Sequence, residues 1–148
     1  MHTCKQHSYG QTLLELVIAI GVVAVIVTGL VVAATSSLRY GQDSRLRSTG
    51  VKYAQEGLEY ARQIRDTQPP NTFLSYSGGG SESWCLDQTG AWTVNGGSCP
   101  PIASGSPYSR TVTFTWNDPI MTVVSLVSWN EGGTVTSTQL QTDLTQWR

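Results

Sequence analysis

The sequence predicts an α+β protein in which one long N-terminal helix packs on a small antiparallel β-sheet. Two observations predict this fold. An apolar run of 19 residues from Leu16 to Ala34 continues into an amphipathic segment with helical spacing, and residues 110–148 alternate between apolar and polar side chains. With 148 residues, the chain has room for one domain of ordinary size and not for two independent cores.

The apolar run has the length of a membrane span. Thr28 is its only polar side chain, and at about 1.5 Å per residue it just crosses a hydrocarbon core of about 30 Å. It is too long for a strand, and in lipid each backbone group must find its hydrogen bond inside the segment, which requires a helix. We therefore expect residues 11–38 to form a membrane-inserted helix.

Three interpretations of this helix are open. It could be a secretory signal that is cut at the small residues of 31–35, or a signal anchor that is retained. The third interpretation starts from Glu15, whose carboxylate lies one turn inside the apolar helix. An acid there costs about 2.5–3.5 kcal/mol at mid-membrane depth and less near the interface. A signal peptide gains nothing from an acid at this depth. The position of Glu15 therefore indicates a positively charged partner.

The residues before the run are Gly10-Gln11-Thr12-Leu13-Leu14-Glu15-Leu16. This junction resembles the processing and assembly signal of type IV prepilins and type II secretion pseudopilins, and the resemblance covers residues 5–38. It implies a leader, residues 1–10, that a membrane prepilin peptidase removes by cutting between Gly10 and Gln11. It also implies N-methylation at Gln11, although the family usually has an aromatic residue or Met there. Lys5, the leader's single Lys or Arg, fits a leader on the cytoplasmic side.

The resemblance gives Glu15 an assembly role that physical chemistry supports. Cleavage creates an α-amino group at Gln11 that is cationic or nearly so at neutral pH, and Glu15 lies four residues further on the same helix face. In a bundle of such helices, Glu15 of one subunit can pair with the Gln11 amine of a neighbour. This pair fixes the register, because a slipped register would bury two unpaired charges. Gly21, Gly29 and Ala33 lie near one stripe and favour close helix packing.

Residues 39–66 predict an amphipathic continuation of the same helix. Apolar or small side chains recur on one face at helical spacing, namely Leu46, Tyr53, Ala54, Gly57, Tyr60, Ala61 and Ile64. Gln68-Pro69-Pro70 ends the helix. Gly41 and Gly50 predict a bend or a local break in the middle, and the whole helix would be about 80 Å long.

Residues 67–109 are expected to form a connector without secure regular structure, because glycine, serine, asparagine and proline dominate its turns. Only residues 91–94 could form a short strand. Cys85 and Cys99 are the cysteines that remain once the leader with Cys4 is removed. A pair of cysteines in a loop of an exported domain predicts a disulfide that stabilises the fold by about 3 kcal/mol. Two free thiols are the alternative.

Residues 110–148 predict an antiparallel meander. The expected strands are 110–116, 121–129 and a third that begins at 134–140, separated by turns at 117–119 and 130–133. Val112, Phe114 and Trp116 share one face of the first strand, and Trp129 is expected in the core with them. The long helix would cover that face, which matches the pilin-like fold that the resemblance implies.

Composition argues against an enzyme, a metal site and a nucleic-acid-binding protein. The chain has 9 Lys+Arg against 10 Asp+Glu and therefore lacks a basic surface. Both histidines, His2 and His7, lie in the leader, which leaves no Ser-His or Cys-His pair and too few metal ligands. Glu56 and Glu59 are expected on a solvated helix face. We expect no catalytic residues, no metal and no cofactor.

The motif implies a structural subunit, a minor pilin or pseudopilin, of a type IV pilus-like or type II secretion filament. Its partners would be the prepilin peptidase, the membrane, an inner-membrane assembly platform and other pilin subunits. The chain would span the inner (cytoplasmic) membrane once, with its head outside the cytoplasm, before it enters a cell-surface or periplasmic filament.

Two alternatives to a filament subunit are open. The first is a single-pass anchored extracellular binding domain or adhesin that does not polymerise. The second is a secreted soluble protein cut after the apolar run. Trp84 and Trp92, in the expected loop, are the aromatic side chains that could be exposed and contact a ligand.

Overall fold

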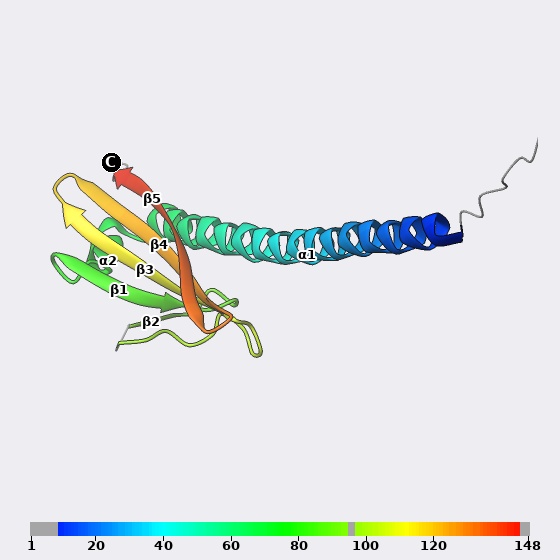
Figure 1. The fold of residues 1–148 in the computed structure, drawn as a ribbon. Coiled ribbons are helices and arrows are strands. Elements are labelled where there is room, and N and C mark those ends of the chain that lie inside the picture. Colours follow the sequence, from blue (N-terminus) through cyan, green and yellow to red (C-terminus); the bar gives the residue numbers. More distant parts are fainter. Residues whose placement is uncertain (1–8, 95–96, 146–148) are drawn as a thin grey trace, which may run out of the picture. The chain divides into compact units, whose positions relative to one another are not determined.

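The computed structural model describes residues 9–94 and 97–145, with side chains from Leu13 onward. In chain order the elements are α1 (Tyr9–Thr67), α2 (Pro70–Ser75), β1 (Ser81–Leu86), β2 (Trp92–Val94), β3 (Tyr108–Asn117), β4 (Ile120–Glu131) and β5 (Thr134–Thr145) (Figure 1). The chain divides into two units, residues 1–44 and residues 45–148, and α1 contributes to both. The second unit is called the head below.

The head contains one five-stranded sheet in the order β2-β1-β3-β4-β5, and all neighbouring strands are antiparallel. Strands β3, β4 and β5 form the predicted meander, which confirms that part of the fold. Asn130 and Gly133 close the turn between β4 and β5, where the Gly133 N–H donates to Asn130 Oδ1 at 2.9 Å. The backbone of Gly133 has a φ of 92°, which favours glycine.

The expectation that residues 67–109 form a connector without secure regular structure is wrong, although the short strand considered at 91–94 is present as β2. This segment forms α2, β1 and β2, and β1 is an interior strand that pairs with both β3 and β2. Half of β1 is polar. Leu86 points into the core, while on the opposite face the Ser83 hydroxyl bonds the Thr113 hydroxyl of β3 at 2.8 Å and Cys85 is buried in its disulfide. Short polar alternation beside a glycine run resembles a loop in sequence, and pairing with β3 makes it a strand.

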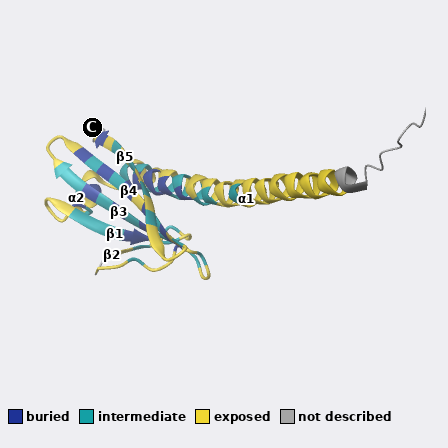
Figure 2. Ribbon diagram, viewed as in Figure 1, coloured by how far each residue is buried: buried dark blue, intermediate teal, exposed yellow. Residues whose placement is uncertain are grey.

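The part of α1 that belongs to the head covers one face of the sheet. Its buried side chains recur at helical spacing and pack against inward-facing residues of the strands (Figure 2). The core members are Ala54, Leu58, Ala61 and Ile64 of α1, Phe73 of α2, and Leu86, Val112, Phe114, Met121, Val123, Val127, Trp129 and Leu144 of the sheet. Burial of each large apolar side chain contributes about 1.5–3 kcal/mol, which makes this contact the main source of the head's stability.

Two glycines let α1 approach the sheet closely. A Cβ atom at Gly57 would lie 2.4 Å from Ser125 Oγ, and one at Gly50 would lie 2.7 Å from the ring of Trp129. Any side chain at either position would push the helix off the sheet. The expected break at Gly41 and Gly50 is wrong, since α1 is continuous through both residues. The missing side chain at Gly50 leaves room for the ring of Trp129 against the helix.

A buried arginine joins the helix to the sheet. Arg110 of β3 is fully buried, and its guanidinium donates to the carbonyl oxygens of Tyr53 (3.0 Å), Leu86 (3.3 Å) and Asp87 (2.7 Å) and to Glu56 Oε2 (3.0 Å). The prediction that Glu56 lies on a purely solvated face is therefore wrong. One oxygen of its half-exposed carboxylate binds Arg110, the one charged residue that is buried in the described part of the chain.

The loop after β1 is held in a conformation that presents backbone acceptors to Arg110. Asp87 Oδ1 accepts hydrogen bonds from the backbone and hydroxyl of Thr89, both at 2.8 Å, and from the Ala91 N–H at 2.9 Å. The Thr89 hydroxyl, followed by these backbone donors, lowers the pKa of the Asp87 carboxyl. The tight turn holds the Leu86 and Asp87 carbonyls toward the guanidinium.

Replacing Arg110 by Met is expected to lower the free energy of unfolding of the head by about 3 kcal/mol, because it removes the donors to the carbonyl oxygens of Tyr53, Leu86 and Asp87. Denaturant unfolding of the full chain in detergent, followed by tryptophan fluorescence, measures this change.

The matched control is Arg62→Met. Arg62 makes a partly exposed pair with Glu59 on α1 and a long hydrogen bond of 3.5 Å to Thr142 Oγ1 of β5, and its loss should cost no more than about 1 kcal/mol. Equal unfolding midpoints for Arg110→Met and wild type would contradict the role given to Arg110.

Candidate assembly surface on the first part of α1

The first part of α1 is apolar and lacks cover from the described chain. Every residue from 13 to 35 is exposed (Figure 2), and the large apolar ones are Leu13, Leu14, Leu16, Val17, Ile18, Ile20, Val22, Val23, Val25, Ile26, Val27, Leu30, Val31 and Val32. This helix is long and apolar enough to span a membrane. An exposed surface of this size requires lipid or other apolar helices around it.

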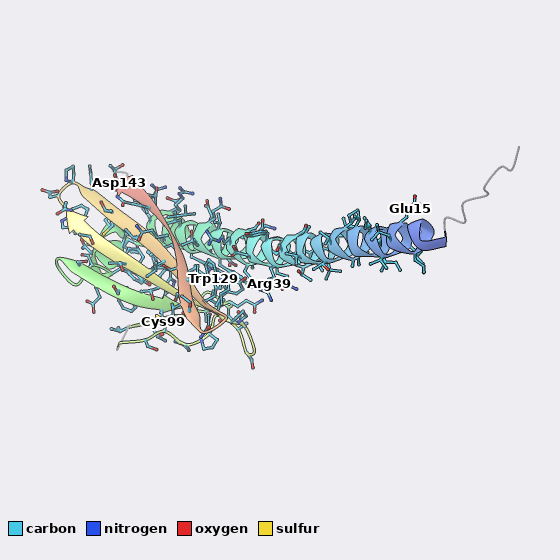
Figure 3. All side chains as sticks on the ribbon, in the orientation of Figure 1. Glu15, Arg39, Cys99, Trp129 and Asp143 are labelled. Atoms are coloured by element: carbon cyan, nitrogen blue, oxygen red, sulfur yellow. A yellow bond between two sulfur atoms is a disulfide. The ribbon has the colours of Figure 1, made fainter. Side chains whose placement is uncertain are left out.

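Glu15 interrupts this apolar surface near its start, where its side chain is exposed (Figure 3). Among the described residues of this unit, the next charged side chain along α1 is Arg39. The two are 24 positions apart, which is about 36 Å along a helix at 1.5 Å per residue. No basic side chain of the described helix can therefore neutralise Glu15, and its partner has to come from elsewhere.

The predicted cleavage site is only partly described. Gly10 and Gln11 fall within the bounds of α1, but their side chains lie outside the described residues. The other leader residues singled out in the sequence, His2, Cys4 and Lys5 among them, also lie outside, as does His7. The contact between Glu15 and the Gln11 amine therefore stays a prediction.

A shallow groove marks one face of the apolar helix. It is lined by Ala24, Val25, Thr28, Gly29 and Val32. The Thr28 hydroxyl donates to the Ala24 carbonyl at 2.8 Å, so it is satisfied within the helix and leaves no unpaired polar group in the groove. Of the three small residues predicted to form a packing stripe, the structure places Gly29 in this groove; Gly21 and Ala33 are exposed outside its lining.

The predicted disulfide between Cys85 and Cys99 is present in the head, with a Cα–Cα distance of 5.2 Å. It joins β1 to the loop before β3 and closes a sequence separation of 14. Thr111 Oγ1 lies 3.2 Å from Cys99 Sγ on the sheet face away from α1. The disulfide therefore fixes the long loop after β2 to the sheet.

The tryptophans expected in an exposed loop belong to the fold instead. Trp84 lies on β1 and Trp92 on β2, both half-buried. Their rings lie 5.1 Å and 5.8 Å from the ring of Tyr76, and Trp92 lies 5.6 Å from that of Phe114. The Trp84 indole N–H donates to the Tyr76 carbonyl at 2.8 Å. Both rings therefore extend the core of the head.

Within the described ranges, no group of three or more His, Cys, Asp or Glu side chains could hold a metal ion. Comparisons of the chain with protein-family models, with curated proteins and with solved structures find no match. The functional argument therefore depends on the apolar helix, its acidic residue and the disulfide of the head.

Filling the groove tests its role in helix packing. Gly29→Leu should weaken self-association of the full chain in detergent by about 1 kcal/mol, or about fivefold in the dissociation constant, because close approach at Gly29 is lost. Energy transfer between labelled copies measures the constant.

Val27→Leu is the matched control, since Val27 is exposed on α1 outside the lining of the groove. It should leave the constant within a factor of two of wild type. Equal effects of the two substitutions would show that the groove is not the packing surface.

Proposed function

We propose that the chain is a structural subunit, a minor pilin or pseudopilin, of a type IV pilus-like or type II secretion filament. The observation that carries the proposal is the position of Glu15. It is an uncompensated carboxylate near the start of a wholly exposed apolar helix, five residues after Gly10.

The proposed assembly step follows from this charge. A prepilin peptidase cuts after Gly10, and the new α-amino group of Gln11 supplies the cation that the described helix lacks. In the membrane the two opposite charges of neighbouring helices attract strongly, because little water screens them. The pair sets the axial register, and the groove around Gly29 allows the backbones to approach.

The head supports the proposed location outside the cytoplasm. Its disulfide between Cys85 and Cys99 is typical of an oxidising compartment, and such bonds are rare in the cytosol. An apolar helix followed by a disulfide-bonded head fits a single-pass protein of the inner membrane that delivers the head to the outside. From there the subunit enters a periplasmic or cell-surface filament through its membrane partners.

A non-polymerising membrane anchor with a binding domain is the competing function, because the same helix could serve as a simple span. Fibres sheared from cells separate the two. A filament subunit is recovered in the sheared fraction, whereas an anchored domain stays with the membrane.

Processing is the first test. Mass spectrometry of the cell-associated protein should show a chain that begins at Gln11, with or without one added methyl group. Gly10→Val should retain the leader, because a side chain at the cleavage position obstructs the peptidase, whereas Gly21→Val should be processed normally. An intact leader in the wild type, or a cut after Ala34, would overturn the proposal.

Assembly is the second test. Glu15→Leu should leave processing intact while reducing incorporation into filaments at least about tenfold, because the register-setting pair is lost. The ratio of sheared to membrane-bound protein on immunoblots measures this effect. Glu59→Leu, the same change at an exposed position on the head's part of α1, should incorporate normally. Normal incorporation of Glu15→Leu would remove Glu15 from the mechanism.

A further inference from the structure

Strand β5 forms one edge of the sheet along its whole length (Figure 1). It pairs with β4 without interruption, from Thr134 opposite Glu131 to Thr145 opposite Ile120. In an antiparallel ladder, every second residue directs its N–H and C=O toward one neighbour, and the residues between them direct theirs the other way. Among the described residues no strand lies on that other side of β5, so about half of its backbone groups have no protein partner.

The features by which proteins usually protect an edge strand are missing from β5. Protected edges are short, are interrupted by a bulge, or carry proline or lysine. Strand β5 has 12 residues, its register with β4 contains no bulge, and its sequence, TVTSTQLQTDLT, contains no Pro, Lys, Arg or Gly. The strand at the opposite edge, β2, is only three residues long. Of the two edges, β5 is therefore the one with room for a further strand.

The core is incompletely covered at this edge. The alternate residues of β5 from Thr136 to Thr142 face the same side as α1, because their partners in β4, the alternate residues from Val123 to Trp129, are all buried there. These β4 residues are at most 2% exposed, whereas the β5 residues are all partly exposed. Leu140 packs against both groups of core residues and still keeps part of its surface uncovered. A strand added beside β5 would complete this cover.

Side chains of α1 reach the same edge, where the Arg62 guanidinium donates to Thr142 Oγ1 at 3.5 Å. An added strand would therefore place one row of its side chains next to Leu140 and α1. The other row would lie beside Gln139 and Gln141, which are exposed on the outer face of the sheet. The best fit is a segment whose side chains alternate between apolar and polar.

A second copy of β5 does not fit as the added strand. An antiparallel pair of β5 strands has a twofold axis perpendicular to the sheet, and this axis reverses the direction of the part of α1 that lies on the sheet. Since α1 is one continuous helix, the two copies would have to enter the membrane from opposite sides. A parallel pair turns one sheet over, so that the apolar row of each copy meets the polar row of the other. The antiparallel argument rests on the membrane-spanning helix of the proposed function.

We propose that the free edge of β5 binds an extended segment of a different exported polypeptide, with apolar and polar side chains in alternation. Backbone hydrogen bonds supply the affinity, and the contact with Leu140 supplies the selectivity. A lipid surface or a charged polymer does not offer alternating N–H and C=O groups. The single charged side chain of β5, Asp143, already accepts a hydrogen bond from the Thr122 hydroxyl at 2.8 Å. This binding goes beyond the proposed filament function and requires no polymerisation.

A synthetic peptide with the sequence of residues 134–145 is the probe. It has the required alternation and, without α1, is free of the constraint on helix direction. Anisotropy of the fluorescently labelled peptide, titrated with the full chain in detergent, should show saturable binding. A peptide of the same composition in scrambled order should bind at least about tenfold more weakly. Equal binding of the two peptides overturns the proposal.

Two N-methylated forms of the probe test the backbone contact. One carries methyl groups on its odd-numbered amides and the other on its even-numbered amides, so each form has one edge that cannot donate. Only one edge of the bound peptide faces β5. One form should therefore lose binding at least about tenfold, while the other binds like the unmodified peptide. Equal binding by both forms shows that the contact is not a strand pairing.

A pair of lysine variants tests which side of β5 is covered. Thr138→Lys places an ammonium group on the side that the added strand would bury, whereas Gln139→Lys places it on the exposed outer face. Thr138→Lys should weaken peptide binding at least about tenfold, and Gln139→Lys should leave it within a factor of two. Unfolding midpoints of both variants are measured first, and Thr136→Lys, on the same side, replaces Thr138→Lys if that chain does not fold. Equal binding by the two variants contradicts the proposal.

Hydrogen exchange of the full chain locates the bound peptide. Saturating peptide should slow exchange of the backbone amides of β5 and leave those of β2 unchanged, because only the outward N–H groups of β5 acquire acceptors. Mass spectrometry of fragments that cover residues 134–145 and 92–94 measures both strands. Protection at β2 without protection at β5 would move the binding to another surface.

Cross-linking in cell membranes tests the choice of partner. Gln139→Cys, at the middle of β5, is made in a full chain that also carries Cys4→Ser, so that Cys85 and Cys99 stay in their disulfide. Treatment with a short bismaleimide should give no more dimer than the Cys4→Ser chain alone. A strong dimer would assign the edge to a second copy and overturn the proposal.

These measurements separate the strand addition from the proposed function. Peptide binding and exchange use the unassembled chain and require neither leader cleavage nor fibres. A processed, filament-forming chain that does not bind the peptide refutes the strand addition alone. A chain that retains its leader refutes the proposed function, whatever the peptide shows.

Discussion

Arg110 carries a guanidinium into the interior of the head, where its charge has to be met by protein acceptors because water is excluded. The alternation of β3 places Arg110 on the same face as Val112 and Phe114, so it cannot leave the core without turning both of them outward. Its acceptors lie on α1 and at the end of β1. One side chain therefore fixes the helix, the sheet and the loop after β1 in a single arrangement.

The same constraint explains the small residues at the helix–sheet contact. A Cβ at Gly57 would meet both Ser125 Oγ and, at 3.2 Å, Arg110 Cδ. Ser125 is fully buried, and within the described chain its hydroxyl has no hydrogen-bond partner, so its small size is what the position requires. The head's part of α1 thus has all its packing partners within the head. The apolar part of α1 has none within its own unit.

Sequence patterns correctly predicted the elements that have a regular spacing of apolar residues of their own. They failed where contacts with residues distant in the sequence determine the structure. The long helix, the strands of the meander and the Cys85–Cys99 disulfide follow from local spacing. Strand β1 was missed because only two of its residues, Cys85 and Leu86, are buried and its pairing with β3 spans a long loop. The pairing of Glu56 with Arg110 was missed because it joins residues 54 positions apart, which no local pattern reports.

Glu15 and Gly29 are the two residues that favour the proposed assembly over a simple membrane anchor. A simple anchor needs only a long apolar helix, and both residues make such a helix less favourable. The carboxylate of Glu15 opposes insertion into the membrane, and glycine lowers helix propensity by about 1 kcal/mol relative to alanine. Neither residue gains anything from the described chain, since Glu15 has no cation within reach along α1 and a Cβ at Gly29 would meet nothing within 4 Å. In the assembly that we propose, both costs are recovered when a second helix brings an amine to the carboxylate and packs its backbone against the groove.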